Sequence, residues 1–536
     1  MNLLKIQEKN YRWFIYAVFT FIGVLGVTIY KDYGISWDEA ISVMNGLVTL
    51  KYILSFFNLS ASIGDGIPEL ADWMDKDYGV VFEAPATAIS ILFAGTEKRD
   101  VILFRHLLTF FAFLWGGFSV YQIARIRFKQ TWLPVLIIFM YFISPRQFAE
   151  GFYNSKDIVF MSAFITGVWT HLLFLQKPTV GLAVLAAMSA ALLIDIRIVG
   201  IILPCFTTGL FAIKIIKQEY TRPPWRSLGI YAVLLPLFII VFWPYLWSAP
   251  FQNFIQSFAN MSHFRWDHIV LFSGKDIPAT DLPWYYVPVW ILISTPVVYT
   301  LFFVLGAVTI AIRLFRSSFH LWKNENEMID VFLLSMVLLP VCIVIVQKSV
   351  IYDGWRQLYF IYPAILLVSL AGVDTLSSFY FFSKLKRVGR TALLLPFIIT
   401  FIVTTVWMVR FHPYQNVYFN RLAGSDRYQN WEVDYWGLSN YELLSFILKN
   451  DPSPIVTVGA VSFMNLQVTA WFFNKEEQSR LQFIEATENP AYLINNFRRS
   501  KDISPPLTSP RHYHEIYRIE VDRESISVIY KRDLSN

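Results

Sequence analysis

The chain has 536 residues, of which 55% are hydrophobic and only 16% are charged, and its mean hydropathy is +0.47. Soluble domains carry about 25% charged residues, so the composition excludes an ordinary soluble or disordered protein and indicates a polytopic membrane protein. The net charge of +6 does not indicate a nucleic-acid partner, because the basic residues lie in short segments between apolar runs. Cys205 and Cys342 both lie inside apolar runs, which argues against a disulfide framework and against a cysteine zinc site.

Apolar runs predict about eleven transmembrane helices, since a spanning helix needs about 20 mostly apolar residues. The runs lie at residues 13–30, 101–124, 131–145, 157–176, 179–195, 198–216, 228–247, 286–311, 330–349, 357–375 and 391–410. The first run follows Lys5, Lys9 and Arg12, and no small-residue cleavage site comes after it. We therefore expect a retained helix rather than a removed signal peptide.

The charges of the connecting segments predict the orientation. Taken alternately, one side holds the basic N-terminus and the basic residues around positions 125–129, 177, 214–226, 313–323 and 384–390. The positive-inside rule places this side in the cytoplasm. The first loop on the other side, residues 31–100, holds eleven acidic and five basic residues. With an odd number of spans, the N-terminus is cytoplasmic and the C-terminal tail lies outside, across what we expect to be a bacterial cytoplasmic (inner) membrane.

Two regions outside the spans have their own predicted structure. In the first outer loop, residues 41–57 and 80–94 are apolar and moderately amphipathic, which is typical of helices lying in the membrane interface. From about residue 412 the apolar runs give way to a small α/β pattern. We divide the chain into a transmembrane domain at 1–411 and an extracytoplasmic domain at 412–536. The predicted elements of this second domain are strands at 455–458, 482–484, 516–521 and 526–530, and a helix from a Ser439–Glu442 capping box to Leu448.

Polar residues near a membrane point to function, because charge is costly there. On the predicted outer side they gather in five places, namely Gly34–Ala40, Ser144–Asp157, Asp195 with Arg197, His263–Asp281 and Tyr352–Arg356. We expect Asp195 and Arg197 to form an ion pair with each other. The fourth group contains His263, Asp267, His268 and Asp276, which permits a divalent cation, but no spacing matches a known metal site, so no metal ligand is assigned.

These features resemble the GT-C class of integral-membrane glycosyltransferases, in particular the bacterial superfamily of protein O-mannosyltransferases and aminoarabinose transferases (glycosyltransferase family 39-like). The resemblance rests on Asp38-Glu39 after the first span, the 144–157 loop, Tyr352–Arg356 before the tenth span, and His412-Pro413-Tyr414. It implies a polyprenyl- or dolichyl-phosphate sugar as donor and inversion at the anomeric centre. The acceptor is then a hydroxyl of a glycan, a lipid or a protein, and membrane lipids surround the enzyme.

The resemblance assigns Asp38 as the base that deprotonates the acceptor, with Glu39 as its supporting neighbour. For Glu39 a capping box with Ser36 is an equal alternative. Candidates for binding the donor's phosphate or sugar are Arg146, Lys156, Asp157, Arg265, Lys275 and Arg356. The alternatives are an interfacial anchor for Arg356, and ion pairs to Glu150 and Asp157 for Arg146 and Lys156.

Two other functions compete with this transferase. A lipid or sugar transporter, or a flippase, is expected to place charges or Gly/Pro breaks in the middle of its helices. Here mid-helix charge is almost absent, since Arg105 and His106 lie near the start of their run. An O-antigen ligase or polymerase also acts on lipid-linked sugars, and it would depend on outward arginines and histidines rather than on an Asp-Glu pair.

Overall fold

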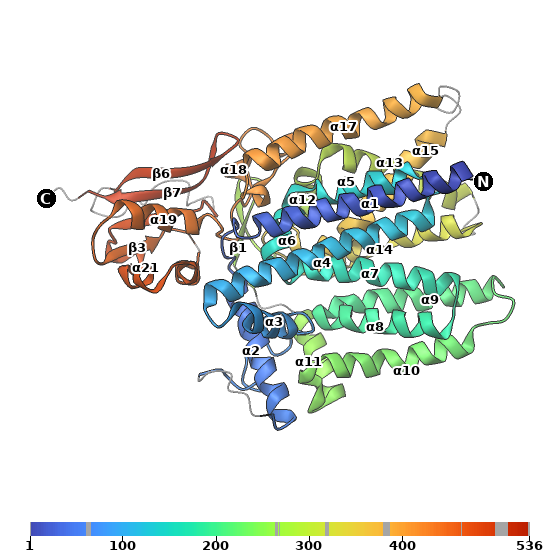
Figure 1. The fold of residues 1–536 in the computed structure, drawn as a ribbon, viewed down its shortest axis with the longest axis horizontal. Coiled ribbons are helices and arrows are strands. Elements are labelled where there is room, and N and C mark those ends of the chain that lie inside the picture. The colour runs from blue at the N-terminus through green and yellow to red at the C-terminus, as the bar shows by residue number, and fades with distance from the viewer. Residues whose placement is uncertain are drawn as a thin grey trace.

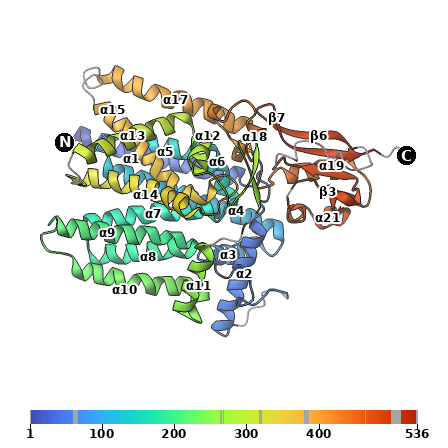
Figure 2. The ribbon, with the colours of Figure 1, turned by 180° about the vertical axis from the view of Figure 1, so that it is seen from behind.

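The structure is a computed structural model that describes residues 2–59, 66–262, 266, 268–316, 321–378, 386–462, 464–498 and 513–533. Its main body is a bundle of long helices, and a small sheet domain is attached at one end (Figure 1). The N-terminus lies at the opposite end of the bundle (Figures 1 and 2). The bundle helices are α1 (Asn2–Ile29), α4 (Lys98–Arg127), α5 (Trp132–Phe142), α6 (Pro145–Tyr153), α7 (Asp157–Gln176), α8 (Val180–Ile196), α9 (Ile202–Ile216), α10 (Trp225–Phe242), α12 (Tyr286–Ser294), α13 (Val297–Arg316), α14 (Glu325–Gln347), α15 (Tyr362–Ser378) and α17 (Lys386–Arg410).

Each of the eleven predicted apolar runs forms helix, but not every run is one long helix. Within the described residues, nine helices are long and apolar enough to cross a membrane, or ten if the bent pair α5 and α6 is one span. The remaining run forms α8, whose 17 residues fall short of that length. The predicted polytopic helical fold is therefore confirmed.

Two of the predicted spans are interrupted at prolines. Between α5 and α6 the chain bends by 64°, and Ser144 is extended because Pro145 follows it. The run at 286–311 breaks in the same way between α12 and α13, where Thr295 precedes Pro296 and is extended. Because both breaks lie towards the end of the bundle that carries the sheet domain, they place irregular backbone there (Figure 1).

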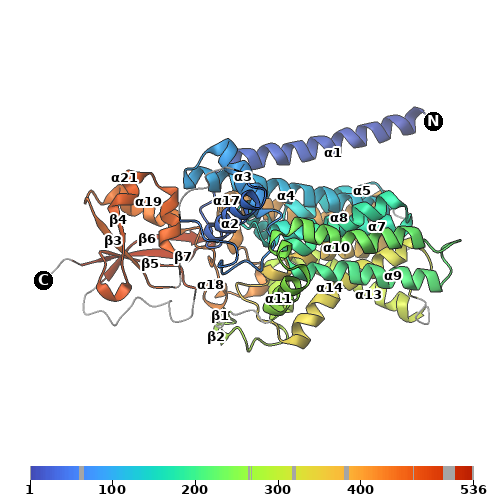
Figure 3. The same ribbon diagram turned by 90° about the horizontal axis from the view of Figure 1, so that it is seen from below.

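Short helices lie across this end of the bundle. The first outer loop forms α2 (Glu39–Phe56) and α3 (Glu83–Ala94), as predicted, and α11 (Pro250–Ser262) lies near them. In Figure 1, α2 and α11 run across the direction of the bundle helices, whereas Figure 3 shows α1 along the bundle's edge beside α4. A two-stranded hairpin of β1 (Ile269–Phe272) and β2 (Lys275–Pro278) also lies here.

The C-terminal domain contains one five-stranded mixed sheet with the strand order β4-β3-β5-β7-β6. β3 pairs in parallel with β4 and β5, whereas β7 is antiparallel to β5 and β6. The four predicted strands are present, and β5 was missed because its short apolar stretch follows a proline and has no alternation. The elements are α18 (Arg427–Asn430), α19 (Asn440–Asn450), β3 (Val456–Ala460), α20 (Leu466–Thr469), α21 (Lys475–Arg480), β4 (Leu481–Phe483), β5 (Tyr492–Asn495), β6 (Tyr513–Val521) and β7 (Glu524–Arg532).

The predicted Ser439–Glu442 capping box is wrong. Ser439 precedes α19, but its own backbone is helical and its side chain makes no capping hydrogen bond. Glu442 instead accepts hydrogen bonds from the hydroxyls of Tyr414 and, at 2.6 Å, Tyr517. The Glu442 carboxylate thus joins α19 to the sheet and to the end of the bundle. Its partners come from other elements rather than from the first turn of its own helix.

Helices α13 and α15 pack closely through two glycines. A Cβ atom added at Gly306 would lie 2.1 Å from the Val368 carbonyl oxygen, and one at Gly372 would lie 2.4 Å from that of Phe302. Small residues allow such close approach between membrane helices.

We expect Gly306→Ala to lower the free energy of unfolding by about 1–3 kcal/mol, because the methyl group meets backbone that cannot move aside. Thermal unfolding in detergent measures the effect. Gly209→Ala is the control, since a Cβ there meets nothing within 4 Å. If both variants unfold at the wild-type temperature, the close packing of α13 on α15 is refuted.

Candidate active site

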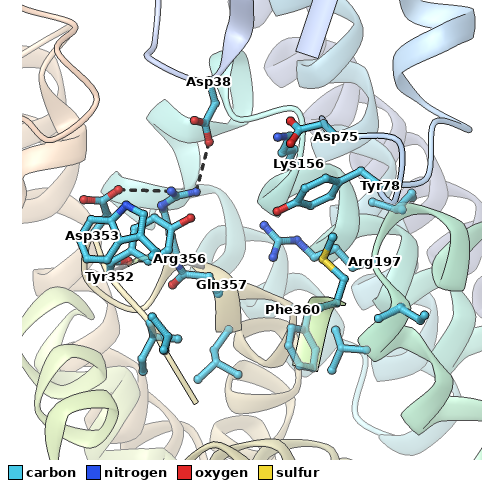
Figure 4. Close-up of a pocket in the computed structure, with 18 of the residues that line it drawn as sticks. Asp38, Asp75, Tyr78, Lys156, Arg197, Tyr352, Asp353, Arg356, Gln357 and Phe360 are labelled. Carbon is cyan, nitrogen blue, oxygen red and sulfur yellow. Dashed lines mark hydrogen bonds and ion pairs between the residues drawn. The ribbon is translucent and has the colours of Figure 1, made fainter. Parts of the chain in front are cut away.

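A cavity of about 420 Å³, here called the end cavity, opens where the bundle meets the C-terminal domain. Its walls come from the loop after α1, the loop before α3, the starts of α7 and η1 (Ile198–Ile201), and the segment before α15. Residues around the ends of α10, α11 and α14, together with the C-terminal domain, contribute the remaining walls. Figure 4 shows Asp38 above the cavity, Asp353 and Arg356 on one side, and Lys156, Tyr78 and Arg197 on the other.

Arg356 is the most connected side chain of this site. It begins η3 (Arg356–Ile361), is 4% exposed, and contacts three carboxylates. Its Nη1 lies 3.0 Å from Asp157 and 3.5 Å from Asp38, and its Nη2 lies 3.2 Å from Asp353. The rings of Tyr352 and Trp436 lie 4.9 and 4.7 Å from the guanidinium. Aromatic faces and three carboxylates therefore hold the group in one orientation.

The carboxylates around Arg356 extend into a continuous chain of alternating charges. Asp157 also pairs with Arg197, and Asp353 also pairs with Arg498. From one ion pair to the next, the order is thus Arg498, Asp353, Arg356, Asp157 and Arg197. Both Asp157 and Asp353 are at most 5% exposed, so each would be costly to bury without its partners.

Lys156 does not belong to this series of ion pairs. It precedes α7, and its ammonium group lies 4.6 Å from the centre of the Tyr78 ring. Within the part of the chain that the structure describes, Lys156 has no ion-pair partner. Burial raises the pKa of the Tyr78 hydroxyl above its ordinary value, so the phenol stays neutral and can donate a hydrogen bond. The pair therefore offers a cation and a donor to an anion in the cavity.

Asp38 and Glu39 are adjacent in sequence but have different surroundings. The Asp38 side chain lines the end cavity and keeps 25% of its surface exposed. Glu39 is buried, lies 2.8 Å from Nε2 of His106, and accepts the Ser36 N–H at 2.7 Å. Successive helical residues point about 100° apart, which explains the separation. The Ser36 contact is one half of the predicted capping box, and the Ser36 hydroxyl instead donates to the Tyr153 carbonyl.

Of the predicted phosphate ligands, Lys156 and Arg356 line the end cavity, and Asp157 lies behind Arg356. Arg146 is buried elsewhere, where Nε donates to the Tyr418 carbonyl at 2.8 Å and the guanidinium lies 4.5 Å from the Phe419 ring. Lys275 is exposed on β2, and Arg265 lies outside the described residues.

Three predicted ion pairs need correction. Asp195 and Arg197 do not pair with each other, because Asp195 accepts the Val81 N–H at 2.7 Å and Arg197 reaches Asp157. The proposed pairs from Arg146 and Lys156 to Glu150 and Asp157 are replaced by the carbonyl and ring contacts described above. Glu150 instead accepts from Asn154 at 2.7 Å and from the Tyr359 hydroxyl at 2.8 Å. Apart from Asn154, which caps the same helix as Glu150, these partners come from other elements, and spacing along the sequence does not reveal them.

Tyr78 and Arg498 are cavity side chains that carried no sequence signal. Tyr78 lies in a loop, and Arg498 lies in the C-terminal domain. The fourth polar group of the sequence is only partly visible, since His263, Arg265 and Asp267 lie outside the described residues. Among the residues that are described, no three His, Cys, Asp or Glu side chains lie close enough to hold a metal ion.

Comparison of the whole fold with solved structures identifies its class. The crystal structure of ArnT from Cupriavidus metallidurans in the apo state matches with a TM-score of 0.50 and 12% sequence identity, over 96% of this chain and 97% of that one. The chain has the fold of ArnT. The predicted resemblance to GT-C proteins is thereby confirmed at the level of the fold.

Two further structures were found. ArnT from the same organism bound to undecaprenyl phosphate gives a TM-score of 0.48 at 12% identity and covers 96% of this chain and 97% of that one. The Archaeoglobus fulgidus oligosaccharyltransferase in complex with Zn and sulfate gives 0.46 at 12% identity and covers 89% of this chain and 68% of that one. No known protein family and no curated protein matches the sequence.

Glu432 connects the C-terminal domain to the turn that carries Asp353. It accepts the Gly354 N–H at 3.3 Å and is fully buried. Burial, followed by the nearby Asp353 carboxylate, raises the pKa of Glu432 to about 8, and Arg498 opposes the rise. The folded state therefore holds this proton more tightly than the unfolded state, in which the pKa is near 4.5.

We expect stability to fall as the pH rises from 4.5 to about 8, because over this range the folded state keeps the Glu432 proton that the unfolded state has already released. Glu432→Gln keeps the site neutral, and thermal unfolding of that variant should show a smaller decrease. The exposed Glu476→Gln is the control and should keep the wild-type slope. An unchanged slope in Glu432→Gln would show that other groups cause the pH dependence.

Proposed function

We propose that the protein is an inverting glycosyltransferase (EC 2.4 class) that moves a sugar from a polyprenyl-phosphate donor to an acceptor hydroxyl. The observation that carries the proposal is that a partly exposed carboxylate, Asp38, and a lysine with no ion-pair partner among the described residues, Lys156, line the same cavity. The shared fold gives further support, since ArnT binds undecaprenyl phosphate.

The chemistry needs a base and an electrostatic contact for the leaving group. The acceptor oxygen attacks the anomeric carbon while the bond from that carbon to the phosphate oxygen breaks. Asp38 takes the acceptor's proton, and the electron pair of the broken bond leaves with the polyprenyl phosphate. Attack from the side opposite to the leaving group inverts the anomeric centre. Lys156, the Tyr78 hydroxyl and Arg356 stabilise the phosphate as it departs.

The position of the cavity favours a transferase over a transporter. A transporter holds its substrate near the middle of the membrane between broken helices. Here the ionisable residues of the cavity come from the end of the bundle that bears the C-terminal domain (Figure 1). The buried pairs of Arg105 with Glu83 and of His106 with Glu39 belong to the same end.

The charges of the connecting segments support an extracytoplasmic site. The basic connection between α9 and α10 lies at the end of the bundle opposite the C-terminal domain (Figure 2). By the positive-inside rule that end faces the cytoplasm, so the end cavity faces the outside of a bacterial cytoplasmic membrane. A lipid-linked donor then enters from the outer leaflet, and the acceptor arrives from the water phase.

Asp38→Asn should reduce turnover by about 100- to 10,000-fold, because it removes the proton acceptor at almost constant volume. The measurement is sugar transfer by purified protein from synthetic polyprenyl-phosphate donors. Asp72→Asn is the control, as it makes the same change on an exposed residue of the same loop. Full turnover by Asp38→Asn would exclude Asp38 as the base.

Lys156→Met should weaken binding of undecaprenyl phosphate by about 10- to 100-fold, because a charged hydrogen bond to the phosphate is lost. Native mass spectrometry reports whether the lipid co-purifies, and titration gives the dissociation constant. Lys275→Met removes the same charge from exposed β2 and should bind as the wild type does. Equal affinity in both variants would remove Lys156 from the phosphate site.

A further inference from the structure

The C-terminal domain supplies part of the wall of the end cavity. Trp436 is 3% exposed and lies over the Arg356 guanidinium at 4.7 Å. Arg498, which follows β5, is 7% exposed and forms an ion pair with Asp353. Since both side chains line the cavity, the domain contacts the proposed catalytic centre directly.

Several backbone contacts fix the domain against the bundle at this point. The Trp37 N–H donates to the Trp436 carbonyl at 3.2 Å. Gly34 approaches so closely that an added Cβ would lie 2.5 Å from the Leu438 carbonyl oxygen. The loop that carries Asp38 and the segment that carries Trp436 are therefore held together as one unit.

The segment around Arg498 is equally well fixed. The Asn496 side chain donates to the Asp434 carbonyl at 2.9 Å, and Arg498 itself donates to the Tyr435 carbonyl at 3.5 Å. Asn496 directly follows strand β5, which pairs on both sides within the sheet. The sheet thereby sets the position of the Arg498 guanidinium relative to Asp353.

Asp353 uses one oxygen for each arginine. Its Oδ1 contacts Arg498, and its Oδ2 contacts Nη2 of Arg356 at 3.2 Å. The backbone of Asp353 has a φ of +55°, a left-handed conformation that non-glycine residues adopt only at a cost. The carboxylate therefore depends on both arginines, together with the Gly354 contact to Glu432, for its orientation.

We propose that Arg498 is a positioning residue of the site. It orients Asp353, and Asp353 in turn holds the Arg356 guanidinium beside Asp38 and the donor phosphate. This inference rests on the proposed function, and it gives the C-terminal domain a direct part in turnover. Loss of Arg498 leaves Asp353 with one arginine partner, so the guanidinium of Arg356 has more freedom to turn.

The test is a double-mutant cycle with Arg498→Gln, Asp353→Asn and the double variant. We expect Arg498→Gln to lower kcat/KM for the donor by about 10- to 100-fold, since small misplacements of a catalytic group have effects of this size. Arg498→Lys should recover part of the loss. In the Asp353→Asn background, Arg498→Gln should have almost no further effect, because its route to Arg356 is already broken.

Arg480→Gln is the control for damage to the domain. Arg480 also belongs to the C-terminal domain, where it binds the backbone carbonyls of Leu448 and Ser453 at 3.2 and 3.1 Å. This variant should lower the unfolding temperature and leave kcat/KM of the folded protein unchanged. If Arg498→Gln behaves in the same way, or if its effect adds fully to that of Asp353→Asn, the positioning role is refuted.

A second cycle separates this inference from the proposed function. Arg498→Gln and Arg356→Gln are combined, and the unfolding temperature is the readout, so no activity is needed. Effects that are less than additive support the link through Asp353, and additive effects overturn it. If the wild type transfers no sugar and binds no undecaprenyl phosphate, the proposed function fails, whereas this cycle still decides whether Arg498 and Arg356 are coupled.

Discussion

The guanidinium of Arg356 is the group on which the site depends. It contacts Asp38, Asp157 and Asp353, and these carboxylates come from three segments that are far apart in the sequence. The loop after α1, the start of α7 and the turn before η3 therefore meet at one cation. Without it, two buried carboxylates would each lose a partner, which is costly in a region of low dielectric constant. One interaction thus brings the walls of the cavity together and sets the charges that face it.

A chain of buried ions is not an efficient means of stabilising a fold. Removing charges from water has a large cost, and well-packed apolar residues are often as stable. The alternating order of Arg498, Asp353, Arg356, Asp157 and Arg197 therefore points to orientation rather than to stability. A fixed array of charges needs little reorganisation when charge develops on a leaving phosphate, and this property is what electrostatic catalysis requires.

The sequence was sufficient to predict the helical membrane fold, because apolar runs and loop charges are local signals. It also predicted that Asp38, Lys156 and Arg356 lie at the same end of the spans, and all three line the end cavity. It did not predict the partners. Arg197 lies two residues from Asp195 and yet pairs with Asp157, and Arg498 reaches Asp353 from a separate domain. Such contacts depend on how the helices and the sheet pack against one another. The hydrophobic periodicity of the sequence does not predict that packing.

The assembly of the site depends on the mixed sheet of the C-terminal domain. β5 lies between β3 and β7, so its position depends on strands from both halves of the domain. Arg498 lies three residues after the end of β5, and its partner Asp353 lies in the turn before the tenth predicted span. The site is thus complete only after the bundle and the sheet have both formed and docked. A bundle without its C-terminal domain would keep Asp38 and Lys156, but it would lack the second arginine of Asp353 and the ring that covers Arg356.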